Sequence, residues 1–93
     1  MKQRPNIDYI MEMTKDYIDG KIDIIDYSLD FPYEMKQRIN AMDDEDRDYS
    51  DLIYEELLIG GVDHAWDMED EEFRKLMRKQ YNKVKRIVRE GFW

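Results

Sequence analysis

Apolar residues recur at helical spacing along the first part of the chain. Residues 7–18 carry one apolar face with a period of about 3.6 residues, and Asn6 precedes that face as a capping residue. Gly20 stands where a C-terminal glycine is expected. A first helix is therefore predicted between them. Its apolar face comprises Ile7, Ile10, Met11, Thr14, Tyr17 and Ile18.

A second helix is predicted to begin at Asp23. Its apolar residues are Ile22, Ile25 and Leu29, with Ile24, Tyr27 and Phe31 beside them. Pro32 disfavours helical geometry at Phe31, so the helix is expected to bend or end there. Asp30 is expected to cap a continuation whose face comprises Met35, Ile39 and Met42. The following run, residues 43–46, has no apolar anchor and predicts a loop.

The second half of the chain predicts two more helices. One opens at Asp48 or Ser50 and runs through Leu58, until Gly60-Gly61 interrupts or kinks it. Asp67 is expected to cap the last helix, which has the clearest period of the chain. Its apolar residues are Phe73, Leu76, Met77, Tyr81, Val84, Ile87 and Val88.

No segment shows the sustained alternation of a strand, and the links are short. The prediction is an all-α fold: one domain over residues 1–93, built as an antiparallel four-helix bundle with four or five helices. The apolar share of 42% and the aromatic share of 13% argue against disorder. With no cysteine, no signal peptide and no spanning segment, a soluble cytoplasmic protein is expected.

Charge divides the chain more sharply than hydrophobicity does. Residues 43–72 hold fourteen acidic side chains and one basic side chain, within a protein of net charge −8. Residues 73–93 hold eight basic side chains and one acidic side chain. The acidic residues before the last helix and the basic residues along it suit the helix dipole. The basic side chains are expected chiefly to pair with the acidic middle, rather than to bind nucleic acid.

Catalytic and metal-binding patterns are weak, so no enzyme and no cofactor is expected. The one histidine, His64, shares a helical face with Ile53 and Leu57 and is interpreted as a core residue. Five residues fit a calcium-loop template, but Tyr49 stands where that loop requires glycine. No metal site is therefore predicted. The five residues are Asp44, Asp46, Asp48, Ser50 and Glu55.

The acidic middle offers the best candidate site. If residues 48–67 form one helix, Leu52, Ile59, Val62 and Trp66 line up on one side, surrounded by carboxylates. This row is either a second core face or an apolar centre with an acidic rim, as in tight protein interfaces. The predicted partner-binding residues are Asp48, Asp51, Glu55, Glu56, Asp63, Asp67 and Trp66.

Two stretches resemble small helical immunity proteins of the colicin D immunity type. The first is residues 17–27, Tyr-Ile-Asp-Gly-Lys-Ile-Asp-Ile-Ile-Asp-Tyr, where one helix ends in a Gly-Lys-Ile link and the next begins. The second is the Gly60-Gly61-Val62-Asp63 segment, followed by an acidic link and residues 70–76, which open the last helix. The bend at Pro32 and the basic tail depart from the pattern.

The resemblance implies a bundle that binds a bacterial nuclease toxin, often one that cleaves tRNA or other RNA. In such a complex, carboxylates stand where substrate phosphates would lie. The expected partner is thus a cognate basic toxin domain, with no membrane, nucleic acid or small-molecule substrate. Two alternatives stay open. One is an acidic helical adaptor for another basic protein, and the other is a nucleic-acid binder that uses the basic last helix.

Overall fold

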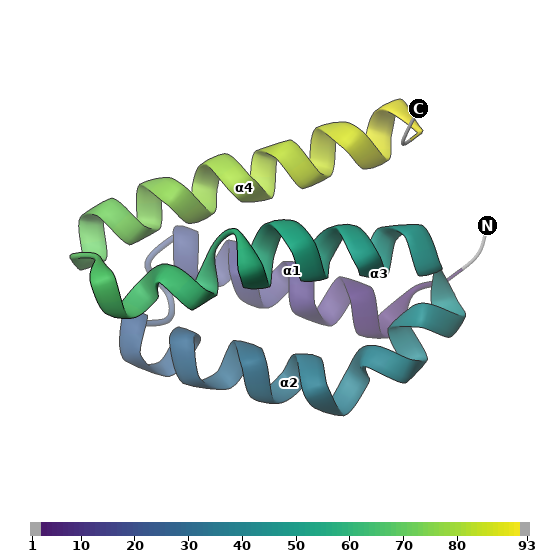
Figure 1. The fold of residues 1–93 in the computed structure, drawn as a ribbon, viewed down its shortest axis with the longest axis horizontal. Coiled ribbons are helices and arrows are strands. Elements are labelled where there is room, and N and C mark those ends of the chain that lie inside the picture. Colours follow the sequence, from purple (N-terminus) through teal and green to yellow (C-terminus); the bar gives the residue numbers. More distant parts are fainter. Residues whose placement is uncertain (1–2, 92–93) are drawn as a thin grey trace.

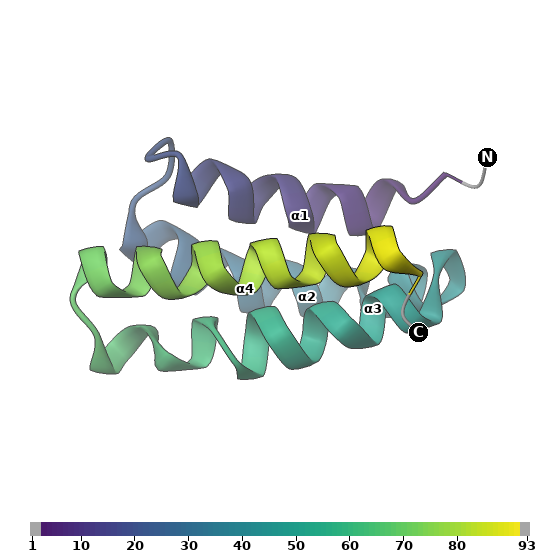
Figure 2. The ribbon, with the colours of Figure 1, turned by 90° about the horizontal axis from the view of Figure 1, so that it is seen from above.

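The computed structural model describes residues 3–91 as four helical segments that run in alternating directions (Figures 1 and 2). In chain order the elements are α1 Pro5–Ile18, α2 Ile24–Glu45, α3 Arg47–Ile53, the π-helix η1 Tyr54–Ile59, the 3₁₀ helix η2 Val62–Asp67 and α4 Asp70–Glu90. The predicted all-α fold with four packed helices is confirmed. No helix within residues 3–91 is both long and apolar enough to cross a membrane.

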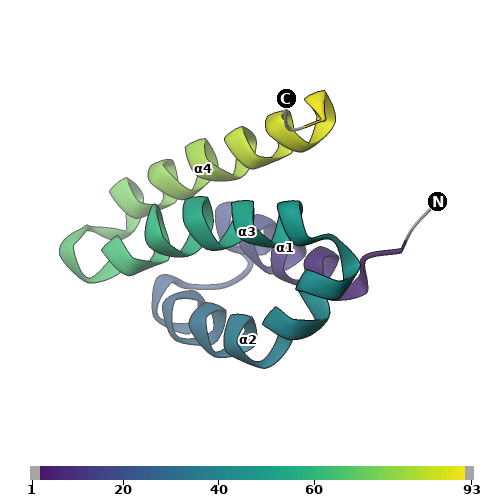
Figure 3. The ribbon, with the colours of Figure 1, turned by 45° about the vertical axis from the view of Figure 1, so that its right-hand side comes forward.

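Each helix packs against its neighbours around one core. α1 contacts α2 and α4, α2 contacts α3, and η1 continues α3 along α4 (Figure 3). An aromatic cluster closes the end of the bundle where α1 finishes and α2 and α4 begin. The rings of Tyr17 and Tyr27 are stacked with centroids 4.7 Å apart, and Phe31 and Phe73 pack beside them. All four side chains are fully buried.

The corner between α2 and α3 differs from the predicted loop. α2 continues to Glu45, whose carboxylate accepts hydrogen bonds from the backbone N–H groups of Asn6 and Ile7, both at 3.0 Å. These N–H groups lie in the first turn of α1, where a helix has unpaired donors. Asp46 then caps α3 by accepting from the Tyr49 N–H at 3.1 Å. Acidic residues of this corner therefore hold three helices together, which a pattern of polar residues alone does not reveal.

Pro32 does not end α2. The proline lies inside the helix, which is unbroken from Ile24 to Glu45. A proline removes one helical hydrogen bond, but the buried rings of Tyr27 and Phe31 keep this turn packed on the core. Tertiary packing thus outweighs the local preference. The same packing leaves Ile25 and Leu29 outside the core, 61% and 55% exposed.

Helix ends follow the predictions in part. Gly20 and Gly91 adopt left-handed conformations, with φ of +83° and +85°, at the ends of α1 and α4, as expected for C-terminal glycines. The predicted starts are wrong in three helices. Arg4 rather than Asn6 precedes α1, α3 begins at Arg47, and α4 begins after Glu69 rather than after Asp67.

Candidate partner-binding surface

The outer side of α3 and η1 carries exposed carboxylates around an exposed apolar side chain. Asp48, Asp51 and Glu55 are exposed, and Ile59, one helical turn after Glu55, is 50% exposed. Asp51 lies 3.7 Å from Arg47, in a pair whose side chains are both more than half exposed. Such a pair contributes little to folding. These carboxylates therefore remain available to a cation from outside.

η2 follows the Gly60-Gly61 turn and adds further exposed carboxylates and an exposed tryptophan. Val62 and Ala65 are buried and hold η2 on the core, while Asp63 and Asp67 are exposed. Trp66 is 74% exposed, the largest exposed fraction among the large apolar side chains in the described part of the chain. We call the surface formed by Asp48, Asp51, Glu55, Ile59, Asp63, Trp66 and Asp67 the acidic surface.

The interruption predicted at Gly60-Gly61 is confirmed, so residues 48–67 do not form one helix. A π-helix replaces the α-helix after Ile53, Gly60 and Gly61 form a turn, and a 3₁₀ helix follows. The apolar row therefore divides: Val62 is 2% exposed and belongs to the core, and Leu52 is half-buried against it. Ile59 and Trp66 alone of that row reach solvent. Val62 and Leu52 therefore fit the predicted second core face. Ile59 and Trp66 are exposed, as an apolar centre of a binding surface would be.

Glu56, predicted with the binding residues, faces α4 instead. Its side chain accepts from Gln80 at 3.1 Å and pairs with Lys83 at 2.9 Å. Gln80 also donates to the Glu56 backbone carbonyl at 2.9 Å. Because these contacts join η1 to α4, Glu56 contributes to the bundle and is not part of the acidic surface.

The glycine pair explains how η1 can approach α4 so closely. A Cβ on Gly60 would lie 2.8 Å from the Gln80 amide nitrogen, and one on Gly61 would lie 2.6 Å from the Met77 sulfur. The turn between η1 and η2 therefore packs directly on α4. His64, just beyond it, is exposed, so its interpretation as a core residue is wrong.

The basic residues of α4 are mostly not paired with the acidic middle, contrary to the prediction. Arg74 pairs with Asp70 at 3.2 Å and Lys83 pairs with Glu56. The other six make no ion pair within residues 3–91, and all are exposed. They lie on the solvent-facing side of α4, opposite its buried residues, and we call them the basic face. The six are Lys75, Arg78, Lys79, Lys85, Arg86 and Arg89.

An apolar groove runs beside the acidic surface, between α2 and the α3–η1 segment. It has a volume of about 230 Å³. Its α2 wall is formed by Pro32, Met35, Lys36 and Ile39, and its other wall by Tyr54 and Leu58. Tyr54 is 45% exposed. Met35 is buried and Ile39 packs against the core, as predicted. The groove itself was not predicted, because the pairing of α2 with the α3–η1 segment cannot be read from helical periodicity.

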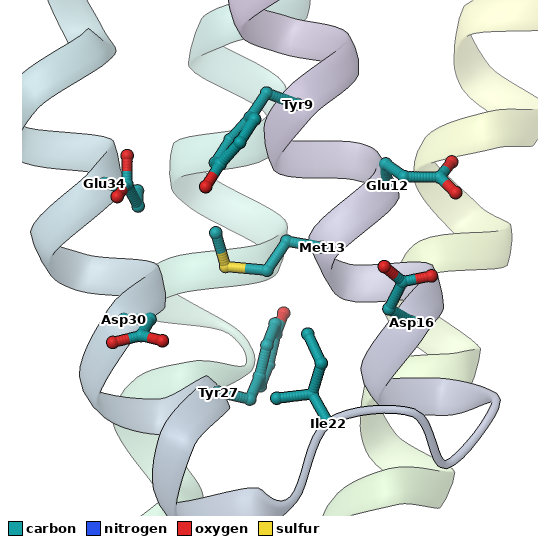
Figure 4. Close-up of a pocket in the computed structure, with 8 residues that line it drawn as sticks. All are labelled: Tyr9, Glu12, Met13, Asp16, Ile22, Tyr27, Asp30 and Glu34. Carbon is teal, nitrogen blue, oxygen red and sulfur yellow. The ribbon is translucent and has the colours of Figure 1, made fainter.

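A second hollow, of about 220 Å³, lies between α1 and α2. Figure 4 shows its apolar floor, with the Met13 sulfur and the Tyr27 ring at the centre. Burial raises the pKa of Tyr27, whose hydroxyl is hydrogen bonded to Thr14 at 2.8 Å. Four carboxylates surround the floor, those of Glu12, Asp16, Asp30 and Glu34. The last of them is paired with Arg38 at 2.9 Å, so the protein itself supplies part of the counter-charge.

The acidic residues do not form a metal centre. Within residues 3–91 no group of three or more His, Cys, Asp or Glu side chains could hold a metal ion. Of the calcium-loop residues, Asp46 caps α3, and Ser50 is buried and donates to Asp43 at 2.7 Å. The helical geometry of this segment is therefore incompatible with a loop wrapped around a cation.

Comparisons with protein-family models, with curated proteins and with solved structures found no match to this chain.

Proposed function

We propose that this chain is an immunity protein that binds and inhibits a cognate basic nuclease toxin, of the tRNase or RNase kind. The observation that carries the proposal is the acidic surface. Five exposed carboxylates, those of Asp48, Asp51, Glu55, Asp63 and Asp67, accompany the exposed apolar residues Ile59 and Trp66. The resemblance of residues 17–27 to colicin D immunity-type proteins supports the same function.

The chemistry of a nuclease cleft suits such a surface. A cleft that binds nucleic acid presents lysine and arginine to phosphates, and carboxylates on a rigid helix can occupy the same positions. Opposite charges raise association rates to about 10⁸–10⁹ M⁻¹s⁻¹ at low salt. Fast binding is needed because free toxin destroys RNA in the cell that makes it. Ile59 and Trp66 then add desolvated contacts that slow dissociation.

Co-expression with a neighbouring gene's nuclease domain tests this function. We expect survival of cells that otherwise die from the nuclease, and a stable complex of the two chains after co-purification. Survival without a complex, or a complex that leaves RNA cleavage intact, contradicts the proposal. Binding to a basic protein without nuclease activity instead indicates the adaptor function.

Nucleic-acid binding through α4 is the second candidate, and the six unpaired cations of the basic face are the observation that favours it. Fluorescence anisotropy with labelled RNA and DNA at low salt tests it. Affinity that falls steeply as salt rises, and that is lost in Arg78→Glu together with Arg86→Glu, supports this candidate. Absence of binding at low salt rejects it.

A further inference from the structure

We infer that the groove between α2 and the α3–η1 segment docks an amphipathic helix of a basic protein partner. Five of its six lining residues, Pro32, Met35, Ile39, Tyr54 and Leu58, present carbon surface, and the sixth is Lys36. A groove between two packed helices is a known receptor for the apolar stripe of a third helix. The inference concerns the docking mode, and it rests on the proposed function only for the identity of the partner.

The apolar surface extends along α2 beyond the groove itself. Ile25 and Leu29 precede Pro32 at helical spacing and are 61% and 55% exposed. The rise of 1.5 Å per residue makes the stripe from Ile25 to Ile39 about 21 Å long. This length matches about four turns of a docked helix. An exposed apolar surface of this extent, bordered by charged residues, is typical of a protein-binding site.

The two edges of the groove carry opposite charges. On the α3–η1 edge, Asp51 and Glu55 stand one turn from Tyr54 and Leu58. On the α2 edge stands Lys36, which makes no ion pair within residues 3–91. A docked helix with basic residues along one side of its apolar stripe therefore fits in one orientation. Its basic side faces Asp51 and Glu55, and an acidic or neutral side faces Lys36.

A second copy of this chain is a poorer occupant. The groove of a second copy is itself a hollow and cannot fill this one. The basic face of α4 has the right charge, but none of the large exposed apolar residues within 3–91 belongs to α4, so it has nothing to fill the groove. The occupant that matches both the apolar lining and the charged edge is a basic amphipathic helix from another protein.

A designed peptide tests the groove without any toxin. The probe is a helix of about 15 residues with leucines at i, i+4, i+7 and i+11, lysines along one side and glutamines along the other. A matched peptide replaces the lysines with glutamates. We expect micromolar binding of the lysine peptide by isothermal titration calorimetry, with NMR shift changes at Pro32, Ile39, Tyr54 and Leu58. The glutamate peptide should bind at least tenfold more weakly.

Two variants with the same change of charge separate groove docking from general attraction to the acidic surface. Tyr54→Asp places a charge in the groove, and Ile59→Asp places one at a similarly exposed position on the outer side of η1. Both strengthen the attraction of a cation, yet only Tyr54→Asp should weaken peptide binding, by at least tenfold. Equal effects of the two variants, or NMR changes confined to Asp48, Glu55 and Ile59, overturn the inference. Circular dichroism verifies that both variants fold.

Further outcomes distinguish the groove from the proposed function. If Tyr54→Asp loses peptide binding but protects cells from the toxin as well as the parent chain does, the groove does not dock the toxin and the proposed function stands. If the peptide binds as expected but no basic nuclease is inhibited, the groove stands and the proposed function fails. A dimer seen by analytical ultracentrifugation and lost in Tyr54→Asp identifies a second copy as occupant and overturns the inference.

Discussion

The acidic surface and the basic face of α4 are both dense in charge, but they differ in what accompanies the charge. Ile59 and Trp66 are 50% and 74% exposed within the acidic surface. None of the large exposed apolar side chains in the described part of the chain lies on α4. The residues of the two ion pairs of α4, Glu56–Lys83 and Asp70–Arg74, belong to neither face.

The difference concerns association and dissociation rates separately. Long-range charge accelerates encounter, whereas buried aromatic and aliphatic side chains slow dissociation. The acidic surface has the components for both steps. The basic face has only the component for encounter, which favours solubility or weak, salt-sensitive contacts with anions. A specific protein partner is therefore expected on the acidic side.

Charge reversal on the two faces should give the largest contrast. Replacing Asp51, Glu55 and Asp63 together with lysine is expected to slow association with the toxin about 100-fold, because steering is lost. Stopped-flow fluorescence or surface plasmon resonance measures the rate, and circular dichroism verifies the fold.

The matched variant replaces Arg78, Lys85 and Arg89 together with glutamate. It changes the same number of charges on exposed side chains, and association is expected to be unchanged or faster because the protein becomes more acidic. If the lysine variant still protects cells fully, or if the glutamate variant slows association more, the acidic surface is not the inhibitory one.

Trp66→Ala should have the next largest effect. The side chain is mostly exposed, so the free energy of unfolding is expected to change by less than about 0.5 kcal/mol. Binding is expected to weaken by about 2 kcal/mol, mainly through faster dissociation, as for an aromatic interface anchor. Dissociation rates from surface plasmon resonance test this. An unchanged rate means that Trp66 lies outside the interface.

Acidic residues with structural contacts should differ from those on the acidic surface in their effect on folding. Glu45→Ala removes the acceptor for the Asn6 and Ile7 N–H groups and is expected to lower the free energy of unfolding by about 1–2 kcal/mol. Asp48→Ala, at an exposed position, is expected to change it by less than about 0.5 kcal/mol. Urea unfolding monitored by circular dichroism compares the two. Equal decreases in the free energy of unfolding for the two variants would show that the hydrogen bonds from Asn6 and Ile7 to Glu45 do not stabilise the fold.

The smallest expected effect concerns the ion pair between η1 and α4. Lys83 pairs with Glu56 at 2.9 Å, and its side chain is 41% exposed, so Lys83→Gln is expected to cost about 0.5 kcal/mol after solvent screening. Lys85→Gln removes an unpaired cation and should change stability by less than this. A larger loss for Lys85→Gln would mean that the basic face contributes to the fold.

The sequence predicts the helices well and their surroundings poorly. Periodicity is enough to place Ile7, Tyr17, Phe73 and Val84 in the core, because one face of each helix must be buried. It fails at the corner after α2, where Glu45 accepts a hydrogen bond from the backbone of Asn6, 39 positions away in the sequence. It also fails between Ile53 and Val62, since no local pattern distinguishes a π-helix from an α-helix. Six of the seven predicted partner-binding residues lie on the acidic surface, where binding stays a prediction, whereas Glu56 contacts α4. The groove was not predicted.

The π-helix η1 also limits what a change in chain length would do to the acidic surface. A π-helix has i→i+5 hydrogen bonds and so accommodates an extra residue within a helical turn. Deletion of one residue between Tyr54 and Ile59 is expected to restore α-helical bonding and to leave the segments before and after it near their present orientation, because the wide turn already absorbs that residue. The change would be confined to the exposed residues of η1, among them Glu55 and Ile59. η1 is thus a place where the chain can gain or lose one residue and alter the centre of the acidic surface while the rest of the bundle keeps its packing.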